Sequence, residues 1–375
     1  MQDLNSERQA SGRLERLLNF LAQDPENPSL REEAAHAAIA AGRYDTCAAL
    51  LEGRTSTDSL RHVQALAWMH QGEVDKAARQ FSALLAAHPQ DTTLKFNLAY
   101  ACALQTDYAQ AASLLDDKTL ADLPAAGPLK LRVLHHESKL DEALALAASL
   151  MKNGAVDPQL YGMAASIALD AERFDLADRY AKHAPELAES RTVNGYLALD
   201  ANHVTNALES FEAAIDAAPE NGRAWVGKGL AYLQSEDLHH AQVNLTQGAQ
   251  LLRTHAGSWV AAGWACFLAG NLAEASADLE TAVELSPAFA EAHGSLAVVR
   301  FHQGQGDAAR RHTEIALRLD KHCLSGALAA SLLSESEGNT DSARELLQNA
   351  LNQEVSLRGR SIAKLLARRH RNPPQ

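Results

Sequence analysis

The amino-acid sequence predicts an all-α fold, a solenoid of stacked helical hairpins, from a repeat and from its composition. A small residue recurs at nearly constant spacing, at Cys47, Ala77, Ala111, Ala143, Ala177, Ala207, Ala241, Ala275, Ala309 and Ala343. The steps are 30, 34, 32, 34 and 30 residues, followed by four steps of 34. Such a period is typical of arrays in which each unit buries its apolar side only against its neighbours. Aromatic residues make up only 5% of the chain and alanine and leucine dominate, which favours helices over strands.

The elements of one unit can be placed in order along residues 221–252. Apolar residues such as Trp225 and Leu230 mark a first helix, polar residues 235–237 form a turn, and a second helix follows. Ala241 and Gly248 are small because the two helices of a hairpin must approach closely there. The sequence therefore predicts one helix-turn-helix hairpin per period.

Prolines indicate where the units end. Pro89, Pro219 and Pro287 each follow a predicted second helix, where the fixed φ and missing N–H of proline terminate a helix. Before the first unit, "RLERLLNFLAQDP" predicts an unpaired leading helix.

The units resemble the tetratricopeptide repeat. Small residues at repeat positions 8, 20 and 27, aromatic residues near 4, 11 and 24, and proline at 32 carry the resemblance. The unit that begins at Ala256 shows it with Trp259, Gly263, Ala275, Leu279, Ala282 and Pro287. The resemblance covers roughly residues 28 to 355 and implies a right-handed superhelix of about ten repeats. Members of this family mostly bind other proteins, and the fold alone does not identify which.

Irregular spacing predicts four segments: a leading helix over 1–27, a first subarray over 28–186, a second subarray over 187–355, and a basic capping helix and tail over 356–375. "LADLPAAGPLK" places two prolines where a first helix should begin, so that unit should start late. "AKHAPELAESRT" shifts the register near residue 186. Arg300 replaces an aromatic residue at position 11 of its unit.

The resemblance also implies a binding surface. In such arrays the first helices line the concave side, and positions 2, 5, 9, 12 and 13 face into it. In the second subarray these positions are mainly apolar, and the predicted partner-binding residues are Tyr196, Leu199, Val226, Leu230, Leu233, Val260, Trp264, Phe267, Leu268, Val298, Phe301, His302, Leu328 and Leu332. Two units of the first subarray are polar there, with Arg132, His135, His136, Gln159, Ser166 and Asp170.

Two interpretations of the apolar positions stay open. An exposed apolar surface over several units favours a partner that covers it, such as an amphipathic helix or an extended apolar segment. Alternatively, a tightly wound superhelix encloses these side chains and makes them part of the core.

The sequence contains no recognisable catalytic, cofactor or metal site. "GRAWVGKG" at residues 222–229 is close to a phosphate-binding loop, but Gly229 stands where that loop needs Ser or Thr, and the segment lies in a predicted helix. Asn97 has apolar neighbours, which argues against the carboxylate clamp of some family members.

Histidine and cysteine are expected to be structural. His135–His136 and His239–His240 are adjacent and point apart on a helix, and His293, His302, His312 and His322 are expected on different turns and faces. Cys47, Cys102, Cys266 and Cys323 are isolated in the sequence, as in small buried thiols of a reducing compartment.

The net charge and the absence of long apolar segments limit the possible partners and the cellular compartment. The net charge of −13 disfavours nucleic acid, and the absence of a signal-peptide or membrane-spanning run predicts a cytoplasmic protein. The tail "SLRGRSIAKLLARRHRNPPQ" places Leu357, Ile362, Leu365 and Leu366 at helical spacing, which favours a cap over a basic handle for nucleic acid, an anionic membrane surface or an acidic partner.

These observations favour a non-enzymatic protein–protein interaction scaffold or chaperone-like adaptor without cofactor. The alanine-rich, lysine-poor composition is typical of a bacterium with a GC-rich genome, where comparable arrays assist the assembly or secretion of multiprotein complexes. The alternative is a regulatory subunit that docks on a large folded enzyme or secretion component. An enzyme or a nucleic-acid binder is the third class, and self-association is compatible with all of them.

Overall fold

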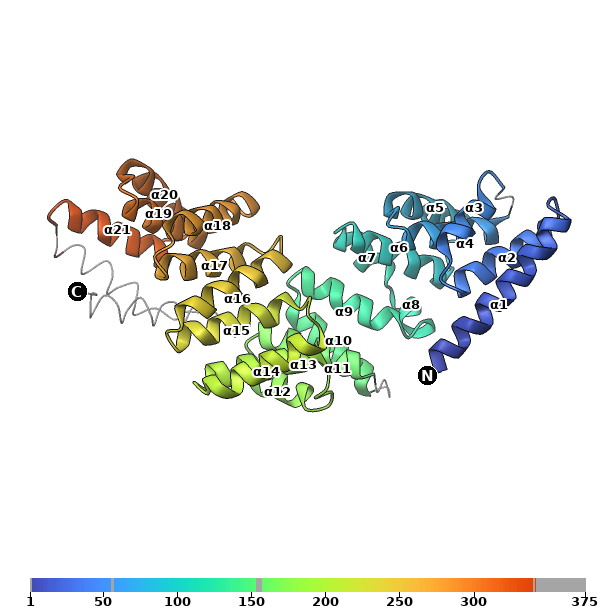
Figure 1. Cartoon of the computed structure of the whole chain (residues 1–375), viewed down its shortest axis with the longest axis horizontal. Helices are drawn as coiled ribbons and strands as arrows, with labels where there is room; N and C mark the ends of the chain where they lie inside the picture. The colour runs from blue at the N-terminus through green and yellow to red at the C-terminus, as the bar shows by residue number, and fades with distance from the viewer. Residues whose placement is uncertain (1, 55–56, 153–156, 340, 342–375) are drawn as a thin grey trace. The chain divides into compact units, whose positions relative to one another are not determined.

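The computed structural model describes residues 2–54, 57–152, 157–339 and 341, and these ranges contain 21 α-helices and no strand (Figure 1). The prediction of an all-α solenoid is confirmed. The chain divides into two compact units, residues 1–171 and residues 172–375, here called the N-terminal and the C-terminal unit.

The N-terminal unit begins with a single helix and continues as helical hairpins. Helix α1 (Gln2–Gln23) packs against α2 and contributes Leu14, Leu17 and Leu21 to the interior. The first helices of the hairpins are α2 (Pro28–Ala40), α4 (Asp58–His70), α6 (Thr92–Leu104), α9 (Ala126–His136) and α11 (Pro158–Asp170). The second helices are α3 (Tyr44–Leu51), α5 (Val74–Ala87), α7 (Tyr108–Leu114) and α10 (Leu140–Lys152), and a short additional helix is α8 (Asp117–Asp122).

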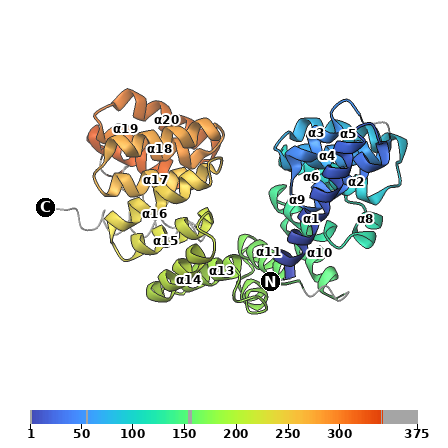
Figure 2. The ribbon, with the colours of Figure 1, turned by 45° about the vertical axis from the view of Figure 1, so that its right-hand side comes forward.

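The C-terminal unit is more regular. Its first helices are α13 (Ala188–Asp200), α15 (Gly222–Gln234), α17 (Ala256–Leu268), α19 (Ala290–His302) and α21 (Leu324–Ser336). Its second helices are α12 (Phe174–Ala181), α14 (Val204–Ala217), α16 (Leu238–Leu251), α18 (Leu272–Leu285) and α20 (Gly306–Leu319). Figure 2 shows the helices from α15 to α20 stacked in chain order.

The turn from each first helix to the next helix contains one residue in the left-handed region. These residues are Gly42, Gly72, Thr106, Ser138, Glu172, Asn202, Glu236, Gly270, Gly304 and Gly338. Their φ values lie between 56° and 88°, and each precedes the recurring small residue by five positions. The spacing found in the sequence is therefore the spacing of the turns.

The recurring small residues lie where two helices meet. All nine that the structure describes, from Cys47 to Ala309, are fully buried, while Ala343 lies outside the described residues. The side chain four places later is buried as well. It is bulky at Leu51, Phe81, Leu115, Phe211, Leu245 and Leu279, and small at Ala147, Ala181 and Thr313.

Glycine at position 8 permits close helix contacts in the C-terminal unit. A Cβ atom at Gly229 would lie 2.5 Å from Cγ of Leu245, and one at Gly263 would lie 2.6 Å from Cγ of Leu279. No side chain fits at such distances without a shift of its neighbour, so these positions require glycine.

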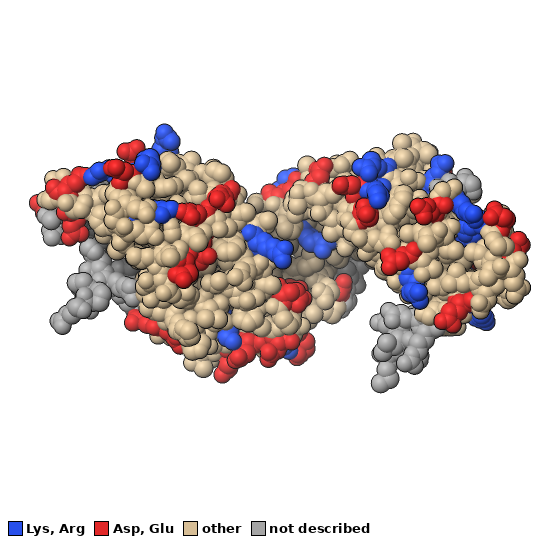
Figure 3. Space-filling model, turned by 45° about the horizontal axis from the view of Figure 1, so that its top comes forward, with Lys and Arg blue, Asp and Glu red and all other residues tan. Residues whose placement is uncertain are grey.

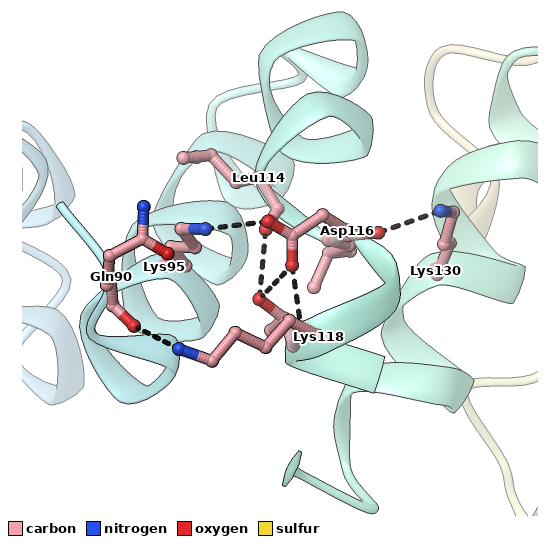
Figure 4. Close-up of polar contacts among 8 residues, drawn as sticks. Gln90, Lys95, Leu114, Asp116, Lys118 and Lys130 are labelled. Atoms are coloured by element: carbon pink, nitrogen blue, oxygen red, sulfur yellow. Dashed lines mark hydrogen bonds and ion pairs between the residues drawn. The ribbon is translucent and has the colours of Figure 1, made fainter. Parts of the chain in front are cut away.

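The irregular unit around the two prolines starts late, as the sequence predicted, but the connection before it contains a short helix that the sequence did not predict. Helix α9 starts late, at Ala126, and α8 fills the connection before it. Nζ of Lys95 donates to Oδ2 of Asp116 over 2.6 Å, and Nζ of Lys130 donates to the carbonyl oxygen of Leu115 over 2.7 Å (Figure 4). Lysines of the flanking helices α6 and α9 thus hold the inserted segment at both sides.

Other boundaries stay predictions. The two compact units meet between residues 171 and 172, whereas the register shift in the sequence lies near residue 186. The basic capping helix and tail over 356–375 lie outside the described residues.

At Arg300 the missing aromatic packing is replaced by polar contacts, because its guanidinium pairs with Glu280 and donates to Gln303 over 3.0 Å.

Candidate partner-binding face of the C-terminal unit

Most of the apolar residues predicted to face a partner are interior. Buried are Tyr196, Leu199, Val226, Leu230, Leu233, Val260, Trp264, Leu268 and Val298. Partly exposed are Phe267, Phe301, Leu328 and Leu332, and His302 is exposed. The interpretation in which the chain encloses its own apolar side chains therefore applies to nine of the fourteen. Contact of any of them with a partner stays a prediction.

Trp264 shows why these residues are interior. Only 2% of its surface is exposed. Its Nε1 donates to Oγ of Ser295 over 2.8 Å, and Ser295 donates in turn to Oγ of Ser325 over 3.2 Å. This chain of hydrogen bonds joins α17, α19 and α21. Sequence reasoning missed both serines, because an isolated serine on a helix does not indicate whether it is buried.

Five of the fourteen predicted residues are accessible, and we call them the aromatic strip: Phe267, Phe301, His302, Leu328 and Leu332. The ring of Phe267 meets that of His302 edge to face, with centroids 4.9 Å apart, and His302 meets Phe301 at 5.6 Å. Leu328 and Leu332 on α21 pack against the same core cluster as Phe267. The strip therefore extends over the first helices of three successive hairpins.

The three helices that carry the strip have few charged side chains, Glu291 and Arg300 on α19 and the exposed Glu335 on α21. Helix α17 contains no charged residue. On α19, the Glu291 carboxylate accepts a hydrogen bond from the backbone N–H of Leu324 over 2.7 Å, and Arg300 pairs with Glu280. On the face of the molecule that Figure 3 shows, acidic and basic side chains are interspersed among uncharged ones. The strip is thus an uncharged, partly apolar surface.

The first helices α9 and α11 of the N-terminal unit present polar groups instead. Nε2 of His135 lies 2.7 Å from Oδ2 of Asp170, and the ring of His136 stacks on Tyr108 with centroids 4.6 Å apart. The guanidinium of Arg132 lies over the ring of Tyr100 at 5.7 Å from its centroid, a cation–π contact. The side chains of this polar stretch, Arg132, His135, His136 and Asp170, therefore largely contact other side chains of the same unit.

Comparison with known proteins identifies the repeats. A tetratricopeptide repeat profile matches residues 63–126, 192–241 and 260–322, and a second such profile matches residues 28–52. Together they cover more than half of the chain. The chain belongs to the tetratricopeptide repeat family. No curated protein matches it.

Solved structures with related folds are also tetratricopeptide repeat proteins. A monomeric mutant of IFIT1 with m7Gppp-AAAA has a TM-score of 0.54 at 15% identity, over 84% of this chain and 83% of that one. Cut9 from an APC/C hetero-tetramer with Hcn1 reaches 0.49 at 14% identity, over 98% and 89% of the two chains. MamA reaches 0.36 at 21% identity, over 45% and 96%. At such identities, the IFIT1 likeness shows the tetratricopeptide fold alone.

Two ligand-binding motifs of other proteins have no counterpart in these repeats. Asn97 is buried, and its Nδ2 lies 2.8 Å from Nε2 of His62, so it does not offer a carboxylate clamp. The segment 222–229 lies inside α15, and Lys228 pairs with Glu212 over 3.2 Å. It is therefore a first helix of a repeat, and its lysine is engaged.

One expectation about histidine is wrong. His293 and His312 do not point to different faces: their Nδ1 atoms lie 3.0 Å apart, between α19 and α20. Nε2 of His293 also lies 3.1 Å from the carbonyl oxygen of Pro287. Since a carbonyl only accepts, His293 carries its hydrogen on Nε2, and His312 donates from Nδ1. This contact joins the two helices of one hairpin. The spacing of residues along a single helix does not reveal such a contact.

The four cysteines are buried thiols, as expected. Burial raises the pKa of Cys47 to about 11, and burial together with the nearby Asp278 raises the pKa of Cys266 to about 12. Such thiols are weak nucleophiles at neutral pH. In the described part of the chain, no three potential ligands gather as a metal site, and no helix is long and apolar enough to cross a membrane.

Proposed function

We propose that this tetratricopeptide repeat protein is a non-enzymatic scaffold or chaperone-like adaptor that binds an apolar helical segment of a partner on the aromatic strip. The observation that carries the proposal is the strip itself: partly exposed aromatic and aliphatic side chains, without charge, on three adjacent first helices. A helix with apolar residues at i, i+3, i+4 and i+7 fits such a surface. A cytoplasmic role in assembling or secreting a bacterial multiprotein complex is the setting that we infer from the composition.

The proposal uses fewer binding residues than the sequence predicted. Trp264 and Leu230 are interior, so they support the surface and do not contact the partner. The anchors are Phe267 and Phe301. Aromatic residues of this kind dominate the energetics of many interfaces.

A displayed library of amphipathic helices, selected on the full chain, tests the proposal. Selected helices should bind wild type and lose about 10-fold or more in affinity for Phe301→Glu, because a carboxylate would be buried against an apolar helix. Val243→Glu is the matched control: Val243 is an exposed apolar residue, 53% exposed, on the second helix α16. Helical content by circular dichroism checks that both variants fold.

Two results would contradict the proposal. In one, the library yields no helix that binds. In the other, Val243→Glu weakens binding as much as Phe301→Glu does, so that the strip is not the site. Binding restricted to a large folded protein would favour the regulatory-subunit alternative. The proposal does not include the ligand of the IFIT1 structure, m7Gppp-AAAA. The strip has no cation that could pair with phosphates, and the chain has a net charge of −13.

A further inference from the structure

His302 is the one polar side chain of the aromatic strip, and its tautomer is fixed. Its Nδ1 lies 2.9 Å from the carbonyl oxygen of Val298, one helical turn earlier on α19. Because a carbonyl oxygen can only accept a hydrogen bond, Nδ1 carries the hydrogen. The neutral ring then has its lone pair on Nε2, which is a hydrogen-bond acceptor.

The surroundings of the ring are aromatic. Phe267 meets it edge to face from α17, with an interplanar angle of 73°, and Phe301 does so at 79° from the same helix. Within the described part of the chain no group hydrogen-bonds to Nε2, and the side chain is exposed. Water therefore satisfies this acceptor as long as the strip is uncovered.

Covering the strip changes that balance. A partner helix that buries His302 removes the water from Nε2. If the helix is purely apolar, the acceptor stays unsatisfied, at a cost larger than the gain from an ordinary hydrogen bond. If the helix carries a hydroxyl or amide N–H at this point, the lost water bond is replaced. A binding site with a buried polar group discriminates strongly against a ligand that lacks the matching group.

Charge complementarity limits the partner further. Around Phe267, Phe301 and His302 the strip has no charged side chain. Arg300 pairs with Glu280, Glu291 accepts from the N–H groups at the start of α21, and the exposed Glu335 lies one turn after Leu332 on α21. A carboxylate or an ammonium group on the partner would lose its hydration without gaining an opposite charge. The fitting partner is uncharged over the contact.

We infer that His302 determines specificity: it selects an uncharged apolar helix that carries one hydrogen-bond donor, a hydroxyl or a side-chain amide, facing Nε2. This inference rests on the proposed function, because it assumes that a helix covers the strip. It goes beyond that function by stating which chemical group the helix must contain and which residue reads it.

The experiment is a double-mutant cycle between the protein and a probe helix. Two probes are used, both labelled with fluorescein. The first is the helix from the library that binds most tightly. In the second, the donor on its apolar face is replaced by an apolar side chain of the same shape, threonine by valine or asparagine by leucine. Affinities are measured by anisotropy at pH 8, above the range in which unperturbed imidazoles are protonated.

For wild type, removal of the donor should weaken binding about 10-fold or more, because it leaves the acceptor Nε2 unsatisfied in the contact. For His302→Phe, which keeps an aromatic ring without an acceptor, the same removal should change affinity less than about 2-fold. His302→Gln keeps an acceptor oxygen and should restore part of the preference. His183→Phe is the matched control, since Nδ1 of His183 also bonds to the carbonyl of the residue four positions earlier, 2.8 Å away, outside the strip.

The outcomes separate the two proposals. Selected helices without any donor on the apolar face, or an equal loss for wild type and His302→Phe, would overturn the role of His302 and leave the helix-binding function intact. Preference for a helix with a carboxylate at that point would overturn it too. Failure to select any helix would contradict the proposed function and the inference together.

Discussion

Position 9 of the repeat, six residues before the left-handed turn residue, has different surroundings in the two units. In the N-terminal unit it is occupied by His36, Leu66, Tyr100, Arg132 and Ser166, none of which is buried. In the C-terminal unit it is occupied by Tyr196, Leu230, Trp264 and Val298, all buried, and by the partly exposed Leu332. The backbone position is the same, so it does not by itself decide whether a side chain meets a partner.

The adjacent position 8 contributes to this difference. It is Ala35, Ala65, Ala99, Leu131 and Ala165 in the N-terminal unit, and Gly195, Gly229, Gly263, Ala297 and Ser331 in the C-terminal unit. Glycine lets the side chain of the second helix approach closely, as Leu279 does at Gly263. Large apolar residues at position 9 then complete the interior. The C-terminal unit thus uses its first helices mainly for stability, and of the fourteen predicted partner-binding residues only the five of the aromatic strip are accessible.

Alanine at position 9 should give the largest effect and distinguish the two units. Trp264→Ala should cost about 3 to 5 kcal/mol, because it leaves a large cavity and removes the hydrogen bond to Ser295. Tyr100→Ala should cost about 1 to 2 kcal/mol, since Tyr100 is partly exposed. Denaturant unfolding combined with hydrogen exchange of α17 to α20 and of α4 to α7 measures both changes. Equal costs would mean that burial at position 9 does not separate the units.

The repeat predicted more of the fold than of the site. The spacing of small residues located the left-handed turn inside each hairpin, because a short helical hairpin allows few turn geometries and one of them recurs. It also located the first helices on which the strip lies. Exposure of Trp264 was not predictable, because it depends on side-chain volumes on α19 and α21, which come from other repeats. The contact of His293 with His312 was not predictable because it joins two helices of one hairpin, and spacing along a single helix does not reveal it.

A second contrast concerns one carboxyl group in each unit. In the N-terminal unit, the Lys95 ammonium that donates to Asp116 lowers the pKa of that carboxyl group below its ordinary value. In the C-terminal unit, burial raises the pKa of Asp278 to about 6, and among the described residues no cation pairs with it. The ionised form of Asp116 therefore stabilises its unit, whereas the ionised form of Asp278 destabilises its own.

Replacement of Asp278 by asparagine should reveal this second contrast. The native pKa of about 6 lies above the ordinary value of 3.8, so the native state binds the proton more tightly, and stability of the C-terminal unit should fall as the pH rises from about 4 through 6. Asp278→Asn should then add about 1 to 2 kcal/mol at pH 7, a value reduced from the full shift for partial exposure, and little at pH 4.5. Unfolding of both proteins across this range measures the difference.

Wild type and Asp278→Asn are compared at each pH because His312 also makes the stability of the C-terminal unit depend on pH. Burial lowers the pKa of His312, so its contribution to stability is lost as the pH falls below 6.5. That loss occurs equally in wild type and Asp278→Asn and cancels. A constant difference between the two from pH 4.5 to 7 would show that Asp278 is not destabilised by burial.

The smallest expected effect concerns the turns, which are the feature that both units share. Thr106 in the N-terminal unit has φ = 64°, a conformation that is costly for a β-branched residue, whereas Asn202 in the C-terminal unit has φ = 63° and asparagine tolerates it. Thr106→Gly should therefore stabilise by about 0.5 to 1 kcal/mol, and Asn202→Gly should be neutral or slightly destabilising, since Oδ1 of Asn202 accepts a hydrogen bond from Gln234 over 2.6 Å. Gly270→Ala, at φ = 88°, should cost about 1 kcal/mol. Thermal unfolding ranks the three variants. Equal gains for Thr106→Gly and Asn202→Gly would mean that backbone strain at the turn does not depend on the residue, and that the five non-glycine turns are tolerated for another reason.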